Sequence, residues 1–199
     1  MPMHYDRDFL PAAELPRARL PLLQHLVETY ASETSKTAAV WSELTDAQLE
    51  FRPHGRSSSV RQILVHQLLS ERRFFAEFIG LAEPPVETVL PAGEAPGVRD
   101  YVDRLVALAR PRLATLADGD EAFWRAEVPF FDVRRERIWV FWRRVLHTCH
   151  HRTQVQTWLR LAGHEPVPAI YGPSGDVKWD QADPTYSIEA AKRGASPSN

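Results

Sequence analysis

Apolar residues recur every three or four positions over four stretches of the chain, the spacing that gathers side chains on one face of an α-helix. The first stretch runs from about residue 16 to residue 44, and its apolar face carries Leu20, Leu23, Leu26, Val27 and Tyr30. The other three run from about 58 to 79, from 98 to 116 and from 135 to 162. The pattern therefore predicts four long amphipathic helices.

Capping and helix-breaking residues mark where these helices begin and end. Ser57 or Ser58 is expected to cap the second helix, and Gly163 to end the fourth. Pro111 predicts a kink or a break in the third helix. Residues 80–97 hold four prolines and three glycines, which is typical of a long loop.

The remaining segments give a weaker pattern. Residues 117–134 fit neither a helix nor a loop clearly, and no segment shows the alternation that a sheet requires. Four long helices with one long crossover predict an all-α fold, a four-helix bundle. We assign residues 1–173 to the bundle and residues 174–199 to an irregular, partly disordered tail.

Composition and charge narrow the classes of protein. The chain has 199 residues, 44% of them apolar and 25% charged, which suits one globular domain. A net charge of −2 gives no general basic field for nucleic acid. We interpret the five arginines between residues 134 and 144 as the solvated side of a helix, with a phosphate site as the alternative.

The sequence favours a cytoplasmic location. Cys149 is the single cysteine, so no intrachain disulfide is possible. The N-terminus has no basic region followed by an apolar run, so we expect no signal peptide. No stretch approaches the roughly 18 apolar residues of a membrane-spanning helix, so we expect no membrane partner.

Candidate chemistry lies in the fourth helix, where the sequence reads His147-Thr148-Cys149-His150-His151. Residues four apart differ by about 40° around a helix and about 6 Å along it, so His147 and His151 can reach one ion together. Helical spacing turns both toward the bundle interior and turns Cys149 away. The alternative is one exposed histidine and one satisfied by hydrogen bonds in the core. Thr148 stands where zinc proteases of this spacing have a glutamate, which argues against that class.

A useful site needs a third ligand, and His66 is the histidine placed in the middle of another helix. It lies on a narrow polar strip with Ser59, Gln62, Ser70 and Arg73. Periodicity leaves open whether this strip faces solvent or lines a cavity. We interpret Glu71 and Asp132 as solvated carboxylates, although either is a possible base for a metal hydrolase.

Three stretches resemble the DinB-like family of bacterial four-helix bundles. Residues 59–66 resemble the segment that ends in a ligand histidine, and residues 147–154 resemble its histidine-xxx-histidine stretch. Residues 159–173 resemble the sequence that follows. Thr153 departs from the glycine that is frequent in the family, so local packing there is expected to differ.

The resemblance implies three metal ligands, His66, His147 and His151, in an up-down-down-up bundle that is often a homodimer. It implies one divalent ion, and chemistry like that of transferases and isomerases that use a low-molecular-weight thiol on an electrophilic substrate. Ligation by imidazoles alone suits zinc, nickel, copper or iron, and we favour zinc or nickel. The alternative is a non-catalytic metal-binding module for stress response or association. Gln154, Arg152 and His150 are the candidates for support of the ligands; for Gln154 and Arg152 a surface polar pair is the alternative.

Overall fold

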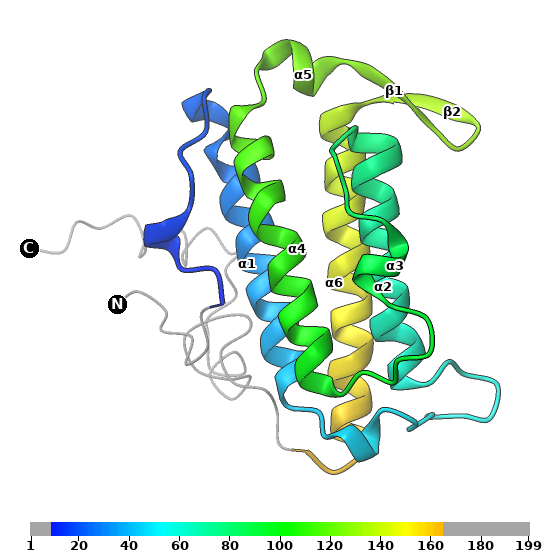
Figure 1. Ribbon diagram of the computed structural model, residues 1–199. Coiled ribbons are helices and arrows are strands. Elements are labelled where there is room, and N and C mark those ends of the chain that lie inside the picture. The colour runs from blue at the N-terminus through cyan, green and yellow to red at the C-terminus, as the bar shows by residue number, and fades with distance from the viewer. Residues whose placement is uncertain (1–8, 165–199) are drawn as a thin grey trace, which may run out of the picture. The chain divides into compact units, whose positions relative to one another are not determined.

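Four long helices form the body of the structure, a computed structural model that describes residues 9–164 (Figure 1). They are α1 (Gln24–Ser42), α2 (Val60–Phe74), α4 (Val98–Asp118) and α6 (Arg137–Leu161). Each overlaps a stretch predicted from periodicity, although α1 begins at Gln24, well after the predicted start near residue 16. The all-α four-helix bundle is confirmed.

The helices follow the up-down-down-up order. Figure 1 shows α1 and α6 running in one direction and α2 and α4 in the other. The parallel pair α2 and α4 is joined by the crossover of residues 80–97, which contains the short helix α3 (Val86–Val89). Helix α6 packs against both α1 and α2, so it connects the two sides of the bundle.

Local chemistry explains where the helices begin and end. Helix α2 is capped by Ser59, whose hydroxyl accepts from the Gln62 backbone N–H, and not by Ser57 or Ser58 as predicted. A single π-helical turn, Phe75–Ile79, extends α2. Gly163 ends α6 with φ +84°, as expected. Helix α4 continues through Pro111 without a break.

The segment left undecided by the sequence forms a short helix and a hairpin. Helix α5 spans Glu121–Arg125, and strands β1 (Glu127–Phe130) and β2 (Val133–Glu136) pair antiparallel. The expectation that no segment forms a strand is therefore wrong. Each strand has four residues, too few to show alternation, and β1 contains Pro129. The hairpin is held by packing of Phe130 against Phe74 and Phe78.

The core lies where the helices face one another. Trp41 is 0% exposed and Trp124 is 1% exposed. Side chains from several helices and the π-helical turn share one buried cluster, including Leu26, Val27, Phe75, Leu113 and Phe141. None of the helices among the described residues is long and apolar enough to cross a membrane. The expected tail, residues 174–199, lies outside the described residues.

Candidate metal centre

Three imidazoles from two helices converge on one point. His66 projects from the middle of α2, and His147 and His151 project from successive turns of α6. The Nε2 atom of His147 lies 3.4 Å from Nε2 of His66 and 3.2 Å from Nε2 of His151. One nitrogen from each ring lies within 4.8 Å of the other two. The structure thus brings together the three histidines that the sequence singles out.

The three histidines lie at the surface of the bundle, between the middle parts of α2 and α6. His66 is exposed, and His147 and His151 are partly buried. The polar strip of α2 therefore faces both solvent and the histidine pair of α6. This position gives the three rings a neighbouring helix on one side and access to water on the other.

The Nδ1 atoms of the two α6 histidines each contact a neighbouring side chain. His151 Nδ1 lies 3.0 Å from Gln154 Oε1, and because an amide oxygen only accepts, His151 Nδ1 is the donor. His147 Nδ1 lies 3.1 Å from Arg144 Nη1. Gln154 thus contacts the His151 ring, one of the three that converge, whereas the contact of Arg144 with His147 was not predicted.

Burial and a nearby positive charge keep the three rings neutral. Loss of solvation and, second to it, the guanidinium of Arg144 together lower the pKa of His147 to about 3. The same two causes, in the same order, lower the pKa of His66. Burial also lowers the pKa of His151. At neutral pH each ring therefore has a lone pair, as metal coordination requires.

The spacing of the nitrogens suits a divalent ion. Four ligands at the roughly 2.0–2.1 Å zinc–nitrogen distance of a tetrahedral site lie about 3.3 Å from one another. The two Nε2–Nε2 distances from His147, 3.2 and 3.4 Å, lie on either side of that value. The group as a whole is looser, with its three nitrogens within 4.8 Å of one another.

A buried ionic network lies behind the imidazoles. Glu71 is 2% exposed, so its interpretation as a solvated carboxylate is wrong. It accepts hydrogen bonds from Tyr30, Arg112, Arg144 and Thr148. The positive charges of Arg144 and Arg112 and the hydrogen bonds hold the pKa of Glu71 below its usual value, although burial alone would raise it.

Arg144 is part of this network, so the arginine-rich start of α6 is not simply a solvated side. Arg144 is 1% exposed, whereas Arg134, Arg135 and Arg143 are exposed as expected. A charged residue spaced three or four positions from Val140, Phe141 and Thr148 was the available sequence signal.

The other residues considered at the sequence level lie around this centre. Arg152 is fully buried and pairs with Glu33, so it is not a surface polar residue; its Nη2 also lies 3.3 Å from Cys149 Sγ. His150 is exposed, with its ring 5.0 Å from that of His151. Trp158 is 6% exposed and belongs to the core. Thr153 is exposed and donates to the Cys149 carbonyl.

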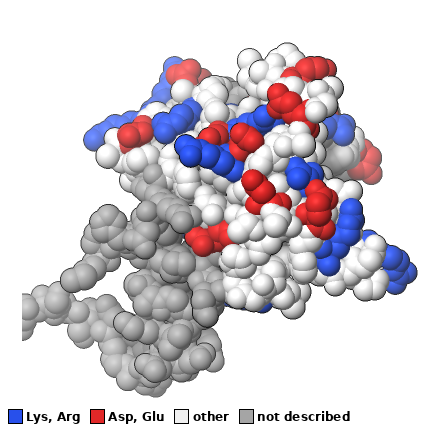
Figure 2. Space-filling model, turned by 60° about the horizontal axis from the view of Figure 1, so that its bottom comes forward, with Lys and Arg blue, Asp and Glu red and all other residues white. Residues whose placement is uncertain are grey.

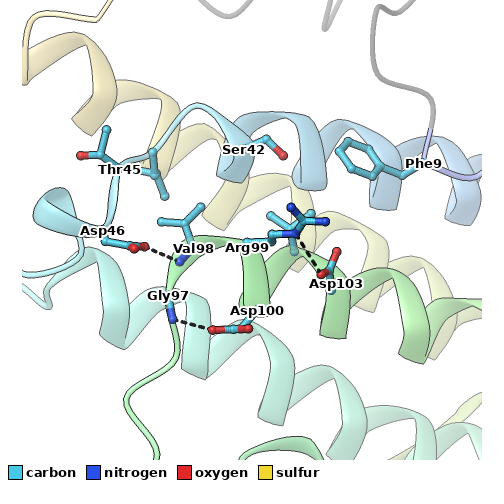
Figure 3. A pocket seen from close by; sticks show the side chains of 11 residues that line it. Phe9, Ser42, Thr45, Asp46, Gly97, Val98, Arg99, Asp100 and Asp103 are labelled. Atoms are coloured by element: carbon cyan, nitrogen blue, oxygen red, sulfur yellow. Dashed lines mark hydrogen bonds and ion pairs between the residues drawn. The ribbon is translucent and has the colours of Figure 1, made fainter.

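A separate cavity of about 650 Å³ lies between the end of α1 and the start of α4 (Figure 3). Its acidic side chains serve local structure: Asp46 accepts from the Val98 backbone N–H at 2.7 Å and Asp100 from that of Gly97 at 2.8 Å. Lys and Arg are interspersed with Asp and Glu on the face that Figure 2 shows, so that face presents no extended region of one charge.

The fold and the three-imidazole centre define a class of helical-bundle protein, and sequence comparison gives the family. The chain matches the model of the DinB family over residues 17–185 and belongs to that family. No curated protein matches it.

Two solved structures share the fold. A DinB-like protein of Bacillus cereus ATCC 10987 is 18% identical with a TM-score of 0.64, and the match covers 73% of this chain and 95% of that one. A DinB-like protein of Bacillus subtilis is 16% identical with a TM-score of 0.58, covering 73% and 96%. At these identities the likeness concerns the fold alone.

Proposed function

We propose that the protein binds one divalent metal ion, zinc or nickel, through Nε2 of His66, His147 and His151. The observation that carries the proposal is the pair of Nε2–Nε2 distances, 3.2 and 3.4 Å, between rings of two different helices. If His147 and His151 only formed hydrogen bonds in the core, no third histidine from another helix would be required at the nitrogen spacing of a tetrahedral site. The neutrality of the rings and the support of His151 by Gln154 favour the same conclusion.

The centre is suited to an exogenous ligand. Three neutral ligands leave a divalent ion with its full positive charge and an open position, the arrangement of catalytic zinc sites. Because His66 is exposed, that position can be reached from solvent. An ion held there would act as a Lewis acid that lowers the pKa of a coordinated thiol or water.

Thiol activation fits the surroundings better than hydrolysis with a carboxylate base. Among the described residues the ligand group contains imidazoles alone. Glu71 is held by Arg112 and Arg144 and has no free lone pair directed at the centre. Asp132 lies in the hairpin turn before α6 begins. We therefore propose a transferase or isomerase that uses a low-molecular-weight thiol, and a cytoplasmic homodimer as its form.

Metal binding is tested with protein purified without an affinity tag. We expect about one ion per chain by elemental analysis, and loss of that ion in His147→Ala. His150→Ala is the matched control, because His150 lies on the same helix outside the ligand group. A folded wild-type protein that takes up no zinc, nickel or cobalt at stoichiometric levels contradicts the proposal.

The thiol chemistry is tested on cobalt-substituted protein. Coordination of an added small thiol is expected to produce a sulfur-to-cobalt charge-transfer band that is missing in His147→Ala. Turnover of an electrophile by the same thiol must then depend on the ion. A protein that holds the ion but shows neither the band nor turnover over a panel of thiols is instead the non-catalytic metal-binding module.

A further inference from the structure

One of the five arginines between residues 134 and 144, Arg143, differs from the others in its surroundings. The other four each contact a partner: Arg134 pairs with Glu127, Arg135 lies over the ring of Trp139, Arg137 donates to the Phe123 carbonyl, and Arg144 pairs with Glu71. Arg143 is exposed and forms no hydrogen bond, ion pair or ring contact with any residue from 9 to 164. Within this part of the chain, the positive charge of Arg143 is therefore available to a ligand.

Arg143 lies one helical turn before His147. Residues four apart in a helix are separated by about 6 Å along the axis and about 40° around it, so their side chains are neighbours. The next residue, Arg144, is only 1% exposed, so it lies on the core side of α6. Arg143 is exposed and therefore lies on the solvent side, from which a ligand would reach the three histidines.

The neighbours of Arg143 on α6 include no carboxylate. The residues three and four positions away are Trp139, Val140, Leu146 and His147. Trp139 is 41% exposed and Leu146 is 57% exposed, so the cation lies between two apolar side chains at the surface. A guanidinium matches a carboxylate, because its planar N–H groups can donate two parallel hydrogen bonds. These surroundings suit a small ligand in which methylene groups carry a carboxylate.

We propose that Arg143 is a specificity-determining residue that binds a carboxylate of the small thiol, while the thiol sulfur is held at the three-histidine centre. The inference rests on the proposed function and adds the chemical class of its thiol, namely one with a carboxylate a few bonds from the sulfur. A ligand held at two points is oriented, and orientation of a bound nucleophile favours its attack on a second substrate. No bond to Arg143 is made or broken.

The preference for an acidic thiol is measured on cobalt-substituted protein. The sulfur-to-cobalt charge-transfer band is titrated with 3-mercaptopropionate and with 3-mercaptopropionamide, which has the same length and no charge. The ratio of the two dissociation constants gives the preference. In Arg143→Gln we expect the preference for the acid to fall about fivefold, the effect of losing one exposed ion pair. Because every variant is tested with the same two thiols, their different acidity and any chelation by the carboxylate cancel.

Two further variants separate the charge of Arg143 from a general effect. Arg143→Lys keeps a positive charge and is expected to retain more of the preference than Arg143→Gln. Arg134→Gln is the matched control and should keep the wild-type ratio, because Arg134 is an exposed arginine of the hairpin that pairs with Glu127. The affinity for the amide should be the same in all variants. Elemental analysis verifies that each variant holds one cobalt ion.

The inference and the proposed function fail in different ways. A wild-type ratio in Arg143→Gln, with the charge-transfer band intact, overturns the role of Arg143 and leaves thiol binding in place. An equal loss in Arg134→Gln overturns it as well, because the preference would then come from the net charge of the surface. If no thiol gives the band with the wild-type cobalt protein, the thiol chemistry has failed and the role of Arg143 fails with it.

Discussion

Glu71 Oε2 accepts a hydrogen bond from Arg144 Nη2 at 3.0 Å, between two side chains that are only 3% and 1% exposed. The pair joins α2 to α6 directly behind the imidazoles. Its partner Arg112 joins the same carboxylate to α4 and also pairs with Glu83. Since an uncompensated buried charge is costly, this network ties the geometry of the metal centre to the stability of the bundle.

Glu71→Gln is expected to lower the free energy of unfolding by about 3–5 kcal/mol, because Arg144 loses its carboxylate partner while it remains buried. Urea denaturation of the metal-free protein measures the change. Glu77→Gln is the matched control: Glu77 forms an exposed pair with Arg73, and its loss should cost no more than about 0.5 kcal/mol. Equal effects of the two substitutions would contradict the buried network.

The pH dependence of stability should report on His147. Its folded-state pKa is about 3, below the ordinary value of 6.5, so between these values the unfolded chain binds more protons than the folded protein. Stability is then fully present above about pH 6.5 and is lost as the pH falls toward 3. In His147→Gln the decline of the urea midpoint over this window should be shallower. A decline that is unchanged in this variant would exclude His147 as its source.

Gln154→Leu tests the support of His151. Loss of the acceptor for His151 Nδ1 is expected to weaken metal affinity roughly 10–100-fold, the usual effect of removing the partner of a ligand histidine. Titration calorimetry with zinc measures it. Gln156→Leu, two residues further along α6, is the control and should bind zinc as the wild type does. An unchanged affinity in Gln154→Leu would mean that packing alone orients the ring.

Gly119 lies where no side chain fits. A Cβ atom there would come within 2.6 Å of Trp124 Nε1 and 2.8 Å of Phe123 Cδ1, and Trp124 is 1% exposed. Gly119→Ala should therefore destabilise the protein by about 1–3 kcal/mol through overpacking. Gly55→Ala is the control, because no atom lies within 4 Å of the added carbon. Thermal unfolding compares the two, and a neutral Gly119→Ala would show that the α4–α5 connection adapts.

Ser59 and Ser58, at the start of α2, should contribute differently to the stability of the protein. Ser59 is 1% exposed and forms a capping box with Gln62. Ser59→Ala should cost about 1 kcal/mol, because the Gln62 N–H loses its acceptor. Ser58 is exposed and lies before the cap, so Ser58→Ala should have little effect on the urea midpoint. If Ser58→Ala lost more stability than Ser59→Ala, Ser58 would be the N-cap, one of the two positions that the sequence favoured.

The four helices could be predicted because an apolar face of helical period is a local property of the chain. The hairpin could not be predicted in this way. Strand β1 has only two apolar residues, Val128 and Phe130, and the strand pairing is fixed by contacts with the end of α2. Arg112 stands among Leu105, Ala109 and Leu116 on one face of α4, which signals a charge directed inward. Its partner Glu71 comes from another helix, and no local pattern identifies it.

The sequence by itself determined the helices, the end of α6 at Gly163, and the presence of His147 and His151 on one side of that helix, because backbone geometry fixes which residues share a face. The tertiary structure decided that His66 Nε2 lies 3.4 Å from His147 Nε2 and that Arg144 and Glu71 lie behind the imidazoles. Those contacts depend on the rotation and axial register of α2 against α6. That register follows from side-chain packing over the whole core, which no single stretch of sequence encodes.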